Sequence, residues 1–143
     1  MPCQAHLGEV GECKSEFDRR DVSIAVVSFA EPSKLAHYQE LHRWPFTILA
    51  DTERQAYRAF DLKRFSLFRV FSPATLKRYL QLTFKGMKQE PYGGEDIFQS
   101  GGDFLIDRKG TLLFAHRSRN PADRPAPAKL LQEIDRIKAE IVA

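Results

Sequence analysis

The chain has 143 residues, of which 43% are hydrophobic and 29% charged, and its formal net charge is +3 at pH 7. This length and composition predict one globular domain, 1–143, with a core of its own. No run reaches the roughly 18–20 apolar residues of a membrane helix, and no charged and apolar pattern of a secretory signal is present. Two cysteines do not make a disulfide framework, so we expect a reducing, cytoplasmic setting.

The first third of the sequence alternates helical and extended patterns. Residues 3–20 predict a helix, because apolar side chains recur there every three or four residues. The members of that apolar face are Cys3, Leu7, Val10, Cys13 and Phe17. The β-branched run 21–30 predicts a strand buried on both faces. A second helix over 33–44 and a short extended segment over 45–51 follow.

The rest of the chain predicts more helices and a hairpin. Asp51 or Thr52 would cap a helix over 53–62, and the Ser-Pro pair at 72–73 is typical of a helix start. Residues 103–117 predict two apolar strands joined by a tight turn. The last helix follows a proline-rich link, and its apolar stripe comprises Leu130, Ile134, Ile137 and Ile141.

A basic and aromatic segment interrupts this alternation at about 63–100, and we interpret it as an insertion. Between Lys63 and Lys88 the sequence has seven Lys or Arg and no acidic residue. Its interleaved aromatic residues are Phe65, Phe68, Phe71, Tyr79 and Phe84. Such interleaving can serve nucleic acids or anionic membrane surfaces. The plainer interpretation is an amphipathic helix with a solvated basic face.

Four stretches resemble the peroxiredoxin-like 2 group of the alkyl hydroperoxide reductase/thiol-specific antioxidant superfamily. They are "PCQAHLGEV", "WPFTILADTERQAYRAFDLKR", "SGGDFLIDRKGTLLFAHRSRNPAD" and the basic-aromatic insertion. The resemblance covers nearly the whole chain. It implies an α/β fold, a thioredoxin-like three-layer α/β sandwich, here lacking its first core strand.

In such proteins the first core strand ends in a Cys-x-x-Cys pair. Cys3 matches the second cysteine, and the first would fall one residue before Met1. The absent strand would lie between residues 23–29 and 103–107. We expect a truncated start, because a central strand's loss leaves two hydrophobic edges unpaired. The alternative is a degenerate paralogue.

The two cysteines have different predicted roles. Cys3 is in the first turn of its helix, where the macrodipole favours the thiolate, and the resemblance makes it a catalytic residue. The alternative is a small apolar residue on the inner face. Cys13 lies ten residues further on, about 15 Å along a helix, so the two cannot pair within it. We interpret Cys13 as part of the core.

The stretch "AHRSRN" offers cations that could hold a thiolate and polarise a peroxide. The candidates are Arg117 and Arg119, with His116 as a nearby hydrogen-bonding group. The alternative is a strand end with solvated cations and Asp123 capping the last helix. His6 is one turn from Cys3 and could tune it, but we expect an exposed helical histidine.

Two functions remain open. The first is a thiol-dependent oxidoreductase that reduces peroxides or disulfides, with thioredoxin, glutaredoxin or glutathione as reductant. The second is a non-catalytic binding module that uses the basic-aromatic insertion. We expect no metal, no organic cofactor, no nucleic acid and no transmembrane segment. A homodimer formed by strand exchange is possible for a chain with an unpaired strand edge.

Overall fold

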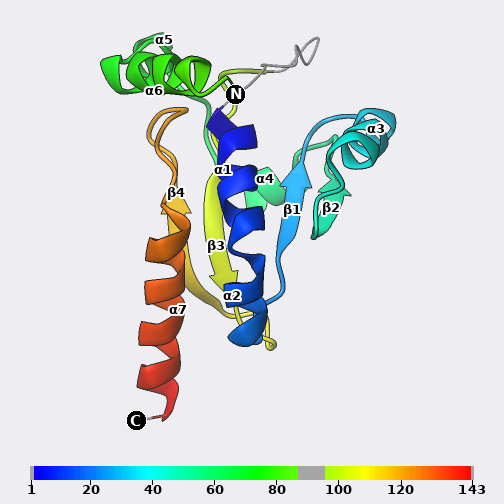
Figure 1. The fold of residues 1–143 in the computed structure, drawn as a ribbon, viewed down its shortest axis with the longest axis vertical. Helices are drawn as coiled ribbons and strands as arrows, with labels where there is room; N and C mark the ends of the chain where they lie inside the picture. The colour runs from blue at the N-terminus through cyan, green and yellow to red at the C-terminus, as the bar shows by residue number, and fades with distance from the viewer. Residues whose placement is uncertain (1, 87–95, 143) are drawn as a thin grey trace.

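A computed structural model describes residues 2–86 and 96–142, with side chains from Gln4 onward (Figure 1). The elements in chain order are α1 (Pro2–Glu12), α2 (Lys14–Arg19), β1 (Ala25–Ser28), α3 (Pro32–His42), β2 (Thr47–Ala50), α4 (Gln55–Ala59), α5 (Leu67–Val70), α6 (Pro73–Phe84), β3 (Gly102–Ile106), β4 (Leu112–Arg117) and α7 (Pro127–Val142). The predicted mixed α/β class is therefore confirmed. None of the helices in these two described ranges is long and apolar enough to cross a bilayer.

The described strands form two separate two-stranded sheets. β1 and β2 are parallel, with Ala25 opposite Thr47. β3 and β4 are antiparallel, with Asp103 opposite His116. The β3–β4 pair confirms the predicted hairpin, whose turn ends at Gly110 with φ 85°, a conformation that glycine adopts without steric cost.

Helices α1, α2 and α7 pack on one face of the hairpin and form the main core. Figure 1 shows α1 and α2 alongside β3, and α7 alongside β4. Four buried side chains form the centre of this core, namely Val10, Phe17, Leu130 and Ile134. Phe60, just after α4, packs on the Phe104 ring with 4.4 Å between centroids. Each large apolar side chain buried in such a core contributes about 2 kcal/mol.

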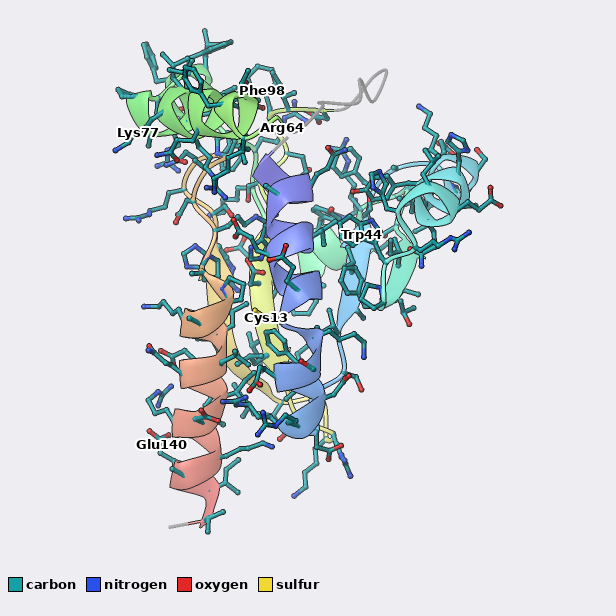
Figure 2. All side chains as sticks on the ribbon, in the orientation of Figure 1. Cys13, Trp44, Arg64, Lys77, Phe98 and Glu140 are labelled. Atoms are coloured by element: carbon teal, nitrogen blue, oxygen red, sulfur yellow. The ribbon has the colours of Figure 1, made fainter. Side chains whose placement is uncertain are left out.

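The predicted helix over residues 3–20 is interrupted at Cys13. α1 ends at Glu12, Cys13 has φ −95° and ψ 6°, and α2 starts at Lys14. Gly11 weakens the turn just before the break, because glycine is a poor helix former. A Cβ atom at Gly11 would lie 3.7 Å from both the Trp44 and Phe46 rings, so the glycine admits these rings against α1. Figure 2 shows Trp44 beside α1.

The prediction that the first strand is buried on both faces is wrong. Along β1, Val26 and Ser28 are half-buried, whereas Ala25 and Val27 are exposed. Among the described strands β1 pairs only with β2. A two-stranded sheet offers less surface for packing than a wider sheet, so the side chains of β1 stay partly exposed to solvent. A cleft of about 990 Å³ separates β1 from β3. Its apolar lining includes Val26, Phe29, Phe60, Phe104 and Ile106.

The predicted helix caps and the predicted apolar face of the last helix agree with the structure, with one exception. Asp51 accepts hydrogen bonds from the backbone N–H groups of Gln55 and Ala56, 2.8 and 2.9 Å long, which confirms its capping role. Ser72 accepts from the Thr75 N–H and caps α6. The α7 stripe is buried except for its last member, Ile141, which lies on the frayed end of the helix.

Candidate functional site

The first turn of α1 carries Cys3. The backbone of α1 is helical from Pro2, so Cys3 occupies the second position of the helix. Its side chain lies outside the described part of the structure. The site is therefore defined by the groups around the next turn of the same helix.

His6 is buried, not exposed as we expected. Only 6% of its surface is accessible, and its Nε2 lies 2.7 Å from Oδ1 of Asp103 at the start of β3. The sequence around His6 does not predict this burial, because the carboxylate that pairs with it is 97 residues away. Side chains three residues apart share a helix face and lean toward the N-terminus. The His6 ring is therefore placed over the turn that contains Cys3.

Arg124 completes a charged cluster with the buried His6 and with Asp103, and both Arg124 and Asp103 are half-buried. One guanidinium nitrogen, Nη1, donates to Asp103 Oδ2 and to the Gly102 carbonyl, at 3.1 Å each. The guanidinium also lies across Gly101, where a Cβ atom would come within 2.2 Å of Nη2. Gly102 leaves no room either, since a Cβ there would be 2.6 Å from the His116 carbonyl oxygen. The absence of side chains at the two glycines therefore lets the Arg124 guanidinium reach the start of β3.

The charges in this cluster keep Asp103 ionised. Burial opposes its charged form, but the hydrogen bond from His6 and the positive charge of Arg124 outweigh burial, so the pKa of Asp103 is lowered. An ionised carboxylate only accepts hydrogen bonds, and Nε2 of His6 must therefore carry the proton in their contact. In the neutral ring Nδ1 then holds the free lone pair. This Nδ1 is buried and has no hydrogen-bond partner among the described residues.

A cavity of about 330 Å³ opens beside this cluster. It is lined by His6, Glu9, Arg78, Ala122, Arg124 and Ala126. Arg78 donates to Glu9 at 2.7 Å and ties α6 to α1 across the cavity. The cavity gives the buried histidine a route to solvent and small molecules. This arrangement of a histidine, a carboxylate and a guanidinium can exchange protons and hold a negative charge.

Arg117 and Arg119 are placed differently from each other. Arg117 is exposed, and its Nε donates to the Phe60 carbonyl at 2.7 Å while its guanidinium lies over the Phe104 ring. Arg119 is exposed and pairs with Asp123 at 3.0 Å. These contacts connect neither arginine to α1.

A second histidine–aspartate pair lies at the end of the hairpin. His116 Nε2 is 3.1 Å from Asp123 Oδ1, and Asp123 also accepts from the Arg119 backbone N–H. The alternative in which Asp123 caps the last helix is wrong, because α7 begins only at Pro127. Burial opposes ionisation of Asp123, yet the hydrogen bonds from Arg119 and the nearby His116 lower its pKa. Asp123 thus organises the loop after β4.

Cys13 belongs to the core, as predicted. It is a free thiol, half-buried, and packs against the cluster around Val10 and Phe17. Figure 2 shows it at the junction of α1 and α2, far along the helix from the first turn. In the ranges 2–86 and 96–142 no group of histidine, cysteine and carboxylate side chains could hold a metal ion.

Asp103 and Arg124 are the residues that sequence reasoning missed. One signal was available for Asp103, because it is the only charged residue in the otherwise apolar run from Gly102 to Ile106. A lone acid at the start of a partly buried strand is costly unless it is paired. No comparable signal marks Arg124, which lies in a proline-rich link among other charges.

The model of the AhpC/TSA antioxidant enzyme family matches residues 11–120. The match covers more than half of the chain. The chain belongs to this peroxiredoxin-like family. A comparison with curated proteins finds no match. Within the AhpC/TSA match lie Asp103, Arg117 and Arg119, whereas Cys3 and His6 precede it and Arg124 follows it. Family membership implies a peroxide as substrate class.

Proposed function

We propose that this AhpC/TSA protein is a thiol-dependent oxidoreductase that reduces peroxides or disulfides, with Cys3 as the working thiol. The single observation that carries the proposal is the His6–Asp103–Arg124 cluster, one helical turn after Cys3. Family membership supports the antioxidant chemistry. The position of Cys3 in the first turn of α1 supports thiolate formation, because the helix dipole favours negative charge there.

The proposed step is nucleophilic attack by the Cys3 thiolate on a peroxide oxygen. A sulfur–oxygen bond forms as the oxygen–oxygen bond breaks, and the leaving alkoxide or hydroxide takes up a proton. Cys3 is oxidised to a sulfenic acid and the peroxide is reduced to an alcohol or water. A second thiol then attacks the sulfur, releases water and forms a disulfide, which an external thiol reductant opens.

Each residue of the cluster has a defined role in this proposal. His6 accepts the Cys3 proton at Nδ1 and returns it to the leaving oxygen. Asp103 fixes the tautomer and orientation of His6 through the 2.7 Å contact at Nε2. Arg124 holds Asp103 in place and adds positive charge to the site. Arg117 and Arg119 would meet the substrate only if the loop after β4 approached α1.

The second thiol in this proposal is the other member of a Cys-x-x-Cys pair, of which Cys3 is the second cysteine. Cys13 is excluded as an intrachain partner by its place at the far end of α1. Thioredoxin, glutaredoxin or glutathione would supply the electrons, as expected in a cytoplasmic setting.

The proposal is tested by peroxide treatment of the reduced protein with a sulfenic-acid trap, followed by intact mass measurement. We expect one adduct, formed rapidly and lost in Cys3→Ser. Cys13→Ser serves as the matched control and should keep the adduct. Slow and equal labelling of the two cysteines, or no labelling, would overturn the assignment of Cys3.

We also propose that the complete sheet of the fold is thioredoxin-like and has one more strand between β1 and β3. The cleft of about 990 Å³ supports this, since its lining is largely apolar and the β1 and β3 strands lie on its two sides. A strand placed there would pair with both edges and join the two sheets, with helices on either face.

This strand position is testable by hydrogen exchange. An extended valine-rich peptide, added in excess, is expected to slow amide exchange at 25–28 and 102–106 together. A scrambled peptide containing proline is the control, because proline cannot donate to a strand ladder. Slower exchange in one strand only, or in neither, would contradict the proposal.

A binding function has separate support. Exposed apolar residues gather on α5 and α6, within the basic-aromatic insertion, for which the sequence left open a binding surface or an amphipathic helix with a solvated basic face.

A further inference from the structure

The α5–α6 segment exposes large apolar side chains on the side that it does not use for packing. The exposed fraction is 87% for Phe68, 71% for Phe71 and 89% for Phe84. We call the whole set the apolar stripe, and its members are Leu67, Phe68, Phe71, Leu76, Leu80 and Phe84. Phe71 and Leu76 also border the cleft between β1 and β3, whereas Leu67, Phe68, Leu80 and Phe84 are not among its lining residues. Figure 1 shows α5 and α6 at the end of the molecule opposite the C-terminus.

The stripe is distinct from the face that anchors α6. Thr75 and Leu82 are buried, and Arg78 binds Glu9 of α1. Leu76, Leu80 and Phe84 follow each other at intervals of four residues, so they share one side of the helix, away from Thr75 and Leu82. The helix is therefore held by one face and leaves the other accessible. An exposed patch of this kind marks an interaction surface.

The charged residues of the segment itself have a single sign. Residues 63–86 contain six Lys or Arg and no acidic residue. Three of these cations, Lys63, Arg64 and Arg78, pair with acids outside this range, namely Asp61, Asp96 and Glu9. Arg69, Lys77 and Lys85 are exposed. Lys77, labelled in Figure 2, lies within α6, seven residues before Phe84 and on the same side of the helix.

We propose that the apolar stripe and its flanking basic residues dock α5–α6 onto the surface of an anionic lipid bilayer. Exposed phenylalanine and leucine would enter the headgroup boundary, while Arg69, Lys77 and Lys85 meet lipid phosphates and carboxylates. A helix of this kind lies in the interface and does not span the membrane. Two copies of the stripe would bring like charges together, which disfavours a dimer through this face. A nucleic acid is disfavoured as the partner, because its charged backbone offers no apolar surface against which the leucine side chains could be buried.

This docking is independent of the Cys3 chemistry, and its test has no thiol readout. The full chain is sedimented with phosphatidylcholine vesicles, with and without phosphatidylserine, at low and at high salt. We expect partition onto the anionic vesicles that falls as salt rises. Phe68→Ser with Phe84→Ser should lower the partition coefficient at least about tenfold. Arg69→Ala and Lys77→Ala should each lower it about fivefold.

Matched controls separate the stripe from general stickiness. Leu41→Ser on α3 and Ile141→Ser on α7 also remove exposed apolar side chains, and Lys129→Ala removes an exposed charge. These variants should partition as the unaltered chain does. Circular dichroism of every variant confirms that the fold is retained.

Three results would overturn the proposal. The first is no binding to anionic vesicles, or binding that the stripe variants leave unchanged. The second is a dimer in sedimentation velocity that Phe68→Ser with Phe84→Ser dissociates, which would assign the stripe to a second copy. The third is tighter binding to an oligonucleotide duplex than to vesicles, with no loss in the phenylalanine variants.

Discussion

The two sheets of this molecule differ in what covers them. The β3–β4 hairpin carries α1, α2 and α7 on one face, and its first strand supplies Asp103. The β1–β2 pair also borders the cleft, but five of its eight strand residues are exposed, against four of the eleven strand residues of the hairpin. Local pairing and helix cover stabilise the hairpin half. Neither pair has a further neighbouring strand within the described residues, so the helix cover is what distinguishes them.

The hairpin half is therefore expected to contribute most of the stability, and the β1–β2 half most of the exposed strand surface. Residues of the hairpin half have fixed partners, and the proposed thiol site is built there. Both halves present apolar side chains to the cleft, but only the hairpin strands also contribute to the main core, through Leu105 and Phe114. If the comparison is right, substitutions in the two halves should have unequal effects.

The largest expected effect is that of Ile134→Ala, in the core between α7 and the hairpin. It should lower the free energy of unfolding by about 3 kcal/mol, because it removes a buried side chain and leaves a cavity. Val27→Ala in β1 should cost less than about 1 kcal/mol, since Val27 is exposed. Urea denaturation followed by circular dichroism measures both. Equal losses of unfolding free energy would mean that the two halves do not differ in stability.

Asp103→Asn should cost about 2 kcal/mol at neutral pH, because it leaves Arg124 and His6 without their carboxylate. The lowered pKa of Asp103 means that its contribution is present above the unfolded pKa, about 3.9, and is lost as pH falls through the folded pKa. Stability of the unaltered chain should therefore decline more steeply toward acid than that of the variant.

The control for this pH dependence is Asp61→Asn. Asp61 is exposed and has a positive φ of 55°, a conformation that asparagine tolerates. Its variant should keep the acid decline of the unaltered chain. An unchanged decline in Asp103→Asn as well would show that the cluster does not cause it.

Hydrogen exchange should resolve the two sheets directly. Amides paired between β3 and β4 should exchange at least about tenfold more slowly than those between β1 and β2, because uncovered elements open more easily. Mass spectrometry of peptides covering 25–28 and 102–106 measures this ratio. Equal protection would mean that the cleft does not weaken β1.

The smallest effect is expected for Arg119→Ala. The exposed ion pair with Asp123 contributes less than about 1 kcal/mol, since solvent screens it. Arg124→Ala removes a more enclosed guanidinium and should cost more in the same thermal or urea titration. A larger loss from Arg119→Ala would reverse the importance that the structure gives to the two arginines.

Sequence patterns predicted the elements that depend on nearby residues. The hairpin, the Ser72 cap and the α7 stripe up to Ile137 are confirmed, because turns, caps and helical periodicity are local. Patterns did not predict the burial of His6, whose partner is distant in sequence. They also predicted too much burial for β1, because an apolar run does not show whether another strand or helix packs on it. The exposure of Phe84 likewise depends on which helix face docks.

The pH dependence of Cys3 alkylation, followed by peptide mass spectrometry, reports directly on activation of this thiol. We expect a midpoint for Cys3 below that of a small model thiol such as N-acetylcysteine. In His6→Gln and Asp103→Asn, with folding checked by circular dichroism, the midpoint should move upward. A midpoint equal to the model thiol, unchanged in both variants, would contradict the role of the His6–Asp103–Arg124 cluster in thiol activation.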